Sequence, residues 1–416
     1  MSASVYLPAE VVVNIVEFVF GEDTTFLPDQ KEKQRDLRSC CLVSRQWYSA
    51  SIGFLYHRPC FLKGNSFVQF TNTVCPPVGT RRKRNVDLGS LVHCLDLGGL
   101  VHHSSNSLTA RLLGRVKKNL EYFVAPRVSF AVNSLPALAK CHKLRYLDLC
   151  QIHGEIEFMT MKKAISHLHE LDTLFLPPLP FCPSVDEDAA GIWPSSLKCL
   201  WLTGVVQLAS MPSFVFPPAL ESLVLQHCRN LRLSVFERIL NRPQLESLLS
   251  LSLFDVSFYE REDGDSSAIY YLPNLVYLGI SWDFLERLLI LPSLPLSFFG
   301  PLSTLPIKVL EIRGDFYEEE ETFDPEKLIK ALTSNLSSLR ALRLQQRPAF
   351  LDSSHAEEIE HLLWRHILAL PQERLDDEDL YHEDMGIVIS DMAYEEARKL
   401  PDVERTIRFP AYRYME

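Results

Sequence analysis

The stretch LRYLDL at residues 144–149 decides the fold, because its three leucines occupy the frame L-x-x-L-x-L. The same frame returns as LKCLWL at residues 197–202 and as LESLVL at residues 220–225. In an extended strand alternate side chains point to opposite faces. The frame therefore predicts a short strand whose leucines point into a core, while the residue between the last two leucines points to the other face.

Ten such frames follow one another along the chain. Their first residues are 92, 120, 144, 171, 197, 220, 248, 275, 307 and 339. Segments with helical apolar spacing lie between several of them, at 107–118, 158–168, 234–240, 284–291 and 325–336. Spacings of 23 to 32 residues resemble those of degenerate leucine-rich repeats. This pattern predicts an α/β solenoid, a leucine-rich repeat arc with parallel strands on its concave face and helices and loops on its convex face.

The first sixty residues have a different, helical pattern. A helix is expected at residues 8–20, with Val11, Ile15 and Phe18 along one face. A polar loop and two further helices are expected at 22–35, 37–42 and 45–56, with Asp36 and Ser44 as N-caps. Three short helices with so much apolar surface cannot bury it in a core of their own. The pattern therefore predicts that another subunit or domain covers this surface.

Two segments carry a family resemblance, LPAEVVVNIVEF at residues 7–18 and LVSRQW at residues 42–47. They resemble the F-box, and with the repeats the chain resembles fungal-type F-box/leucine-rich repeat proteins, the substrate receptors of SCF ubiquitin ligases. In that family the F-box helices bind a Skp-type adaptor, which tethers the cullin scaffold. The loop at 22–35 is longer than the family's. By position, the resemblance implies these adaptor-binding residues: Leu7, Pro8, Val11, Ile15, Leu42, Val43 and Trp47.

A second candidate site is the concave face of the repeats. Several residues that the alternation sends there are large and apolar, and exposed aromatic side chains are where binding energy concentrates in interfaces. We expect an exposed patch that binds the target protein, anchored by Phe175 and Trp201. Pro-rich turns or the C-terminal tail folded over these two residues are the alternative. The expected target-binding residues are Asp148, Phe175, Trp201, Val224, Phe254 and Tyr277.

The domain organisation follows from these patterns. The expected domains are a small all-α F-box at 1–60, a linker at 61–90, the leucine-rich repeat solenoid at 91–350, and a C-terminal helical cap with an acidic tail at 351–416. Residues 353–370 form the amphipathic helix of that cap, which shields the last apolar layer of a solenoid. The basic run RRKR at 81–84 is either a nuclear import signal or an idle part of the linker.

Composition narrows the partners and the compartment. A net charge of -11 disfavours nucleic acid and anionic membranes as main partners. The ten cysteines are scattered without a CxxC pair, which favours reduced thiols and a cytoplasmic or nuclear location. No segment has the length and apolarity of a signal peptide or a membrane span.

Motifs for catalysis, cofactors and metals are missing from the sequence. It holds no GxGxxG, P-loop, GxSxG or HExxH pattern. His361 and His366 are five residues apart, which misses the helical spacing of a two-histidine metal site. The sequence thus predicts a substrate-recognition subunit that is not an enzyme and binds no cofactor. Two alternatives are a leucine-rich repeat scaffold without a ligase role, and an enzyme that uses a pocket in the arc.

Overall fold

Two compact units make up the computed structural model of the chain. Unit 1 comprises Met1–Pro177 and Gly191–Ser196, and unit 2 comprises Pro178–Ala190 and Leu197–Glu416. The structure describes residues 7–21, 27–61, 64–76, 87–100, 106–152, 156–178, 193–204, 215–228, 231, 233–256, 268–281, 284, 305–313, 325–344, 354–368 and 386–389.

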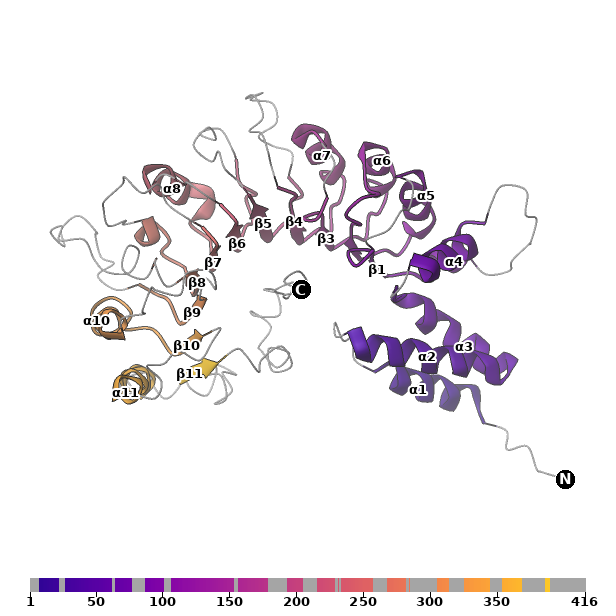
Figure 1. The fold of residues 1–416 in the computed structure, drawn as a ribbon, viewed down its shortest axis with the longest axis horizontal. Coiled ribbons are helices and arrows are strands. Elements are labelled where there is room, and N and C mark those ends of the chain that lie inside the picture. The colour runs from indigo at the N-terminus through magenta and orange to yellow at the C-terminus, as the bar shows by residue number, and fades with distance from the viewer. Residues whose placement is uncertain are drawn as a thin grey trace. The chain divides into compact units, whose positions relative to one another are not determined.

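Four helices open unit 1: α1 (Ala9–Phe20), α2 (Leu27–Val43), α3 (Arg45–His57) and α4 (Gly64–Val74) (Figure 1). Pro8 is the N-cap of α1, where its missing N–H leaves no helical hydrogen bond unmade. Gly21 ends α1 with a φ of 58°, in the left-handed region that glycine adopts freely. Ser44 caps α3 as predicted, since its hydroxyl accepts a hydrogen bond from the backbone N–H of Trp47 at 3.3 Å.

The polar loop predicted at residues 22–35 is wrong from residue 27 onward, and residues 22–26 lie outside the described part of the chain. Helix α2 begins at Leu27, so Asp36 lies inside a helix instead of capping a short one. The sequence from 30 to 35 is polar, but Gln, Lys, Glu and Arg are good helix formers. Gln34 also ties α2 to α3, because its side-chain amide donates to the carbonyls of Leu55 and Arg58 at 3.1 Å each. The long link that set this chain apart from the F-box pattern is therefore absent.

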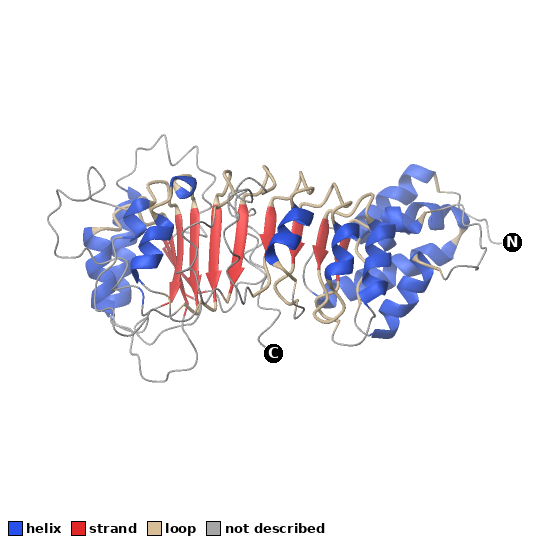
Figure 2. Cartoon of the chain, turned by 90° about the horizontal axis from the view of Figure 1, so that it is seen from above, coloured by secondary structure: helices blue, strands red, loops and turns tan. Residues whose placement is uncertain are grey.

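A row of four parallel strands follows in unit 1: β1 (Cys94–Asp96), β2 (Tyr122–Val124), β3 (Tyr146–Asp148) and β4 (Thr173–Phe175). The return segments contain α5 (Asn106–Val116), α6 (Leu135–Leu138) and α7 (Phe158–Ile165), with 3-10 turns at Leu88–Leu91 and Val132–Ser134. These helices lie on one side of the strands (Figure 1), and the view from above in Figure 2 shows the strands running side by side. We call the other side the helix-free face.

Unit 2 continues the same pattern with longer strands: β5 (Cys199–Thr203), β6 (Ser222–Gln226), β7 (Ser250–Phe254), β8 (Tyr277–Ser281), β9 (Val309–Arg313), β10 (Ala341–Leu344) and β11 (Gly386–Ile389). Each strand pairs in parallel with the next. The return segments contain α8 (Leu233–Leu240), α10 (Pro325–Ser334) and α11 (Ser354–Leu368), with 3-10 turns at Pro243–Leu245 and Ala268–Tyr271. Parallel neighbours require such crossover connections.

The leucine frames form the core of both units. Every frame position of the ten repeats is at most 1% exposed, from Val92 to Leu344. Equivalent positions stand side by side, with Leu95, Phe123 and Leu147 in register in unit 1. The predicted α/β solenoid preceded by a small helical domain is therefore confirmed.

The C-terminal part contains one element that the sequence did not predict. Strand β11 pairs with β10, although it lies in the segment expected to be helical cap and tail. Helix α11 confirms the amphipathic helix at 353–370, with Ile359 and Leu363 fully buried. Residues 64–74 of the expected linker form α4; the domain boundaries themselves stay a prediction. The basic run at 81–84 lies outside the described residues.

Candidate protein-interaction sites

Helices α1, α2 and α3 build a small core of their own. Val12, Val16 and Leu37 are at most 2% exposed, and partly buried residues pack against them: Leu7, Val19, Phe20, Trp47, Ala50, Phe54 and Leu55. The side-chain amide of Gln46 donates to the carbonyl of Leu7 at 2.9 Å, which fixes the segment before α1 against α3. The bundle therefore holds its shape through one narrow apolar contact.

Large apolar side chains cover the outside of the same bundle. Six are exposed there: Val11 (39%), Ile15 (37%), Phe18 (88%), Leu42 (77%), Val43 (63%) and Tyr48 (44%). The rest of the described chain exposes five, spread over several elements. Val11, Ile15 and Phe18 fall on one face of α1 because they are three or four residues apart. We call these six side chains the F-box apolar surface; such a concentration of exposed apolar groups marks an interaction site.

The predicted adaptor-binding residues divide into two groups. Pro8, Val11, Ile15, Leu42 and Val43 are exposed. Leu7 and Trp47 instead pack partly buried against the bundle core, so they also hold the helices together. Phe18 and Tyr48 were not among the predicted site residues; for Phe18 the signal was present, because it continues the stripe of Val11 and Ile15. The role of all these residues in adaptor binding stays a prediction.

The end of α3 is joined directly to the first strand of the repeats. The backbone N–H of His93 donates to the carbonyl of His57 at 3.0 Å, and the two imidazole rings stack with centroids 4.6 Å apart. His93 Nδ1 lies 2.8 Å from the Glu121 carboxylate. The guanidinium of Arg58 lies over the Tyr122 ring, 5.4 Å from its centroid. We call this the α3–β1 junction. Its contacts fix the end of the bundle directly to the repeats of unit 1.

The predicted target-binding residues of unit 1 lie on the helix-free face but are not exposed. Asp148 and Phe175 are 3% and 1% exposed. A carboxylate oxygen of Asp148 accepts a hydrogen bond from the backbone N–H of Cys150 at 2.9 Å, which holds the turn after β3. Phe175 packs against the Tyr146 ring at 5.3 Å, and Tyr146 stacks on Tyr122 at 4.2 Å. Adjacent parallel strands thus bring their side chains into lateral contact.

The same correction applies in unit 2. Trp201, Val224, Phe254 and Tyr277 are between 2% and 8% exposed, so the expectation of an exposed aromatic patch is wrong. Trp201 Nε1 donates to the side-chain carbonyl of Gln226 at 3.0 Å. The Tyr277 hydroxyl donates to Glu311 at 2.5 Å. Neighbouring strands supply these partners; whether the residues bind a target stays a prediction.

Tyr146 and Cys141 are buried groups near the strands whose pKa values favour their neutral forms. Burial, with Tyr122 and Asp148 nearby, raises the pKa of Tyr146 well above its usual value. Burial also raises the pKa of the Cys141 thiol to about 12. A thiol or phenol in that state is a poor nucleophile or acid at neutral pH. These groups act as packing residues of the repeats.

Metal and membrane sites were tested on the same residues. Among those that the structure describes, no group of three or more His, Cys, Asp or Glu side chains is placed to hold a metal ion. Within that part of the chain no helix has the length and apolarity needed to cross a bilayer. The nine cysteines described there are free thiols.

Comparison with known families identifies the helical bundle. Residues 5–62 match the family model described as F-box-like. The chain thus carries an F-box-like domain at its N-terminus, followed by a solenoid with leucine-rich frames. The resemblance predicted from the two N-terminal segments is confirmed.

Two curated relatives come from yeasts. The F-box protein YDR306C of Saccharomyces cerevisiae is 26% identical over 307 residues, which are 72% of this chain and 60% of that protein. Protein pof5 of Schizosaccharomyces pombe is 29% identical over 190 residues, 45% of this chain and 50% of that protein. The chain therefore spans half to three-fifths of the length of these relatives.

A solved structure, the plant peptide hormone receptor RGFR1 in complex with RGF2, resembles 61% of this chain and is matched over 45% of its own. The sequence identity is 13% and the TM-score 0.27. The fold assignment rests on the strand register and the buried frames of this chain instead.

Proposed function

We propose that this chain is a substrate-recognition subunit of an SCF-type ubiquitin ligase, with no active site of its own. Its F-box-like domain binds a Skp-type adaptor, and through it a cullin scaffold, while the repeats bind the target protein. F-box proteins generally serve as such receptors, which contribute proximity and orientation while other subunits carry out the transfer.

The F-box apolar surface is the observation that carries this proposal. Among their described apolar side chains, the three short helices keep only Val12, Val16 and Leu37 inside. Phe18, Leu42 and Val43 remain between 63% and 88% exposed. Burying one large apolar side chain at an interface contributes about 1.5–3 kcal/mol. Covering this surface with an adaptor therefore gives a strong driving force for docking.

The test is adaptor binding by two variants with matched chemistry. Ile15→Asp/Leu42→Asp places two charges on the F-box apolar surface, and we expect it to weaken binding of a purified Skp-type adaptor about 100-fold or more by calorimetry. Val132→Asp/Tyr271→Asp adds the same charges at residues of the repeats that are 48% and 39% exposed, and should leave binding within about twofold. Circular dichroism checks that both variants fold.

An unchanged affinity of Ile15→Asp/Leu42→Asp would overturn adaptor docking at this surface. Adaptor binding without ubiquitin transfer to any co-purified protein in a reconstituted ligase would favour the scaffold alternative. We also propose a cytoplasmic or nuclear location, which the free thiols support.

A further inference from the structure

The repeats of unit 1 hold a basic region that the net charge of the whole chain conceals. Residues 97–147 contain eight Arg or Lys residues and a single acidic residue, Glu121, in a chain whose net charge is -11. The eight are Arg111, Arg115, Lys117, Lys118, Arg127, Lys140, Lys143 and Arg145. That carboxylate lies 2.8 Å from His93 Nδ1, and two of the eight cations pair with carboxylates outside this range, Lys118 with Asp87 and Arg145 with Asp172.

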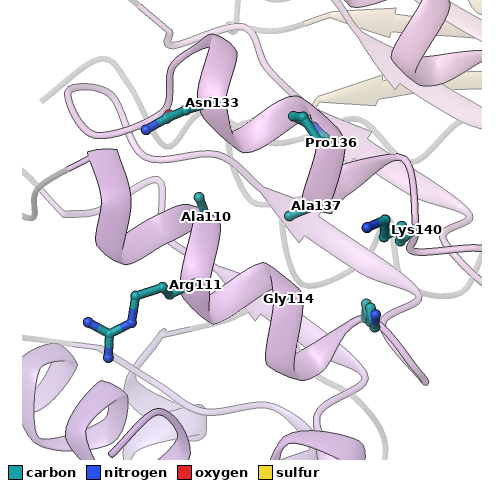
Figure 3. A pocket seen from close by; sticks show the side chains of 8 residues that line it. Ala110, Arg111, Gly114, Asn133, Pro136, Ala137 and Lys140 are labelled. Carbon is teal, nitrogen blue, oxygen red and sulfur yellow. The ribbon is translucent and has the colours of Figure 1, made fainter. Parts of the chain in front are cut away.

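A groove of 340 Å³ lies between α5 and the segment that contains α6. Figure 3 shows Ala110 and Gly114 on one helix facing Pro136 and Ala137 on the other. The short side chains leave room for side chains of a bound molecule. Arg111, Lys117, Asn133 and Lys140 complete the lining. The groove thus combines small apolar residues with three cations.

Within the described part of the chain, no carboxylate pairs with either lysine of the groove. Lys118 pairs with Asp87, and Arg111 donates to the carbonyl of Cys75 at 3.0 Å, so these cations are engaged elsewhere. Among the described residues, neither Lys117 nor Lys140 has an acidic partner. Cations at a helix C-terminus do stabilise the helix dipole. That effect explains their position in the sequence but leaves their charge available to a ligand.

Gly114 is the second observation that points to a ligand. A glycine inside a helix costs about 0.5–1 kcal/mol relative to alanine. Neither its backbone nor its packing requires glycine, since its φ is not positive and a Cβ there would meet nothing within 4 Å. A residue that is unfavourable for its local structure, and that neither the packing nor the backbone conformation requires, is typical of a functional position. Here the missing side chain keeps the groove open.

We propose that this groove binds an acidic segment of a partner protein, with Lys117 and Lys140 as the charge contacts. The apolar floor favours a peptide over nucleic acid, because nucleic-acid grooves add aromatic side chains for base stacking and no aromatic residue lines this one. The site is separate from the F-box apolar surface, so it goes beyond the proposed function and does not depend on adaptor binding.

The test uses a short fluorescein-labelled peptide in which Glu and Ala alternate, with fluorescence anisotropy on the full chain. Lys117→Glu/Lys140→Glu should weaken binding about tenfold or more, because like charges then face each other. Gly114→Leu should weaken it about fivefold by filling the groove without a change of charge. Lys163→Glu/Lys330→Glu makes the same charge change on α7 and α10 and should stay within about twofold.

Three results would overturn the proposal. The first is no binding of the acidic peptide, or equal binding of a peptide with Gln in place of Glu. The second is an equal loss in the Lys163→Glu/Lys330→Glu control, which indicates diffuse charge attraction. The third is full binding by Gly114→Leu, which places the peptide outside the groove. Tighter binding of single-stranded RNA with the same variant pattern would also assign the site to a different ligand.

Discussion

The repeats bury their apolar frame side chains, whereas the F-box-like bundle leaves many of its large apolar side chains exposed. In the repeats every leucine frame position is buried, because successive repeats stack into a continuous core. Among the described apolar side chains of the bundle, only Val12, Val16 and Leu37 are buried, and Phe18 is 88% exposed. A solenoid closes its own core by repetition, whereas a three-helix unit has too little volume to do so. The difference marks which part of the chain is built to be completed by another molecule.

The most direct test of this difference is to replace one leucine by alanine in each region. Leu251→Ala, at a fully buried frame position of β7, should lower the free energy of unfolding by about 3 kcal/mol because it leaves a cavity. Leu42→Ala, at a side chain 77% exposed, should change it by less than about 0.5 kcal/mol. Urea denaturation followed by circular dichroism measures both. Equal losses would show that the bundle surface is structural.

The burial of Lys162 in the repeats predicts a stability that depends on pH. Burial lowers its pKa to about 8, and its ammonium lies 4.5 Å from the centroid of the Trp193 ring. The amine of Lys162 therefore binds its proton more tightly in the unfolded chain than in the folded one. Below pH 8 the charged Lys162 destabilises the fold, and this destabilisation decreases as the pH rises toward 10.5. Lys162→Met should be more stable than the parent at pH 7 by on the order of 2 kcal/mol.

Thermal unfolding of the parent and the variant at a series of pH values checks this prediction. The advantage of Lys162→Met should shrink between pH 8 and 10.5. The exposed neighbour Lys163 serves as the control, and Lys163→Met should leave the free energy of unfolding within about 0.5 kcal/mol. A constant advantage of Lys162→Met across the whole range would mean that its charge plays no part.

A smaller effect is expected on the helix-free face. A Cβ at Gly279 would lie 2.8 Å from the Phe254 ring and 3.2 Å from the Ser252 hydroxyl. Gly279→Ala should therefore cost about 1–2 kcal/mol, since the nearly buried ring must move. Combining it with Phe254→Leu should be less than additive in a double-mutant cycle. Strict additivity would show that the two side chains do not contact each other in solution.

The smallest effect should come from Phe18. Phe18→Ser removes the most exposed large apolar side chain and should leave the free energy of unfolding within about 0.5 kcal/mol. Adaptor affinity measured on the same sample should fall. Loss of stability without loss of affinity would contradict its assignment to the F-box apolar surface.

The strands were predictable from sequence because their signal is local. Each L-x-x-L-x-L frame contains the whole pattern of a strand, and all ten frames coincide with strands β1 to β10. The part of α2 before residue 37 was missed because its polar composition resembles a loop until the contact of Gln34 with α3 is known. Strand β11 was missed because the run GIVI at 386–389 has no frame and its partner lies more than 40 residues earlier.

The sites were less predictable than the fold. Exposure of Val11, Ile15 and Leu42 followed from helical spacing and family resemblance. Burial on the helix-free face did not follow, because the partners of Trp201 and Tyr277 come from neighbouring strands about 25 to 34 residues away. The basic groove was missed because its lysines are scattered among apolar residues and form no run.

Because of the α3–β1 junction, the position of a strand in unit 1 determines its distance from the bundle. Because the backbone of His57 is hydrogen-bonded to His93, β1 starts at a fixed position relative to the bundle. Successive parallel strands are about 4.8 Å apart, so a ligand seated on β4 is three such steps further from the bundle than one on β1. Inserting or deleting a single repeat between them would move that ligand by one strand spacing. The number of repeats in unit 1 therefore sets the distance between the bundle and the ligand.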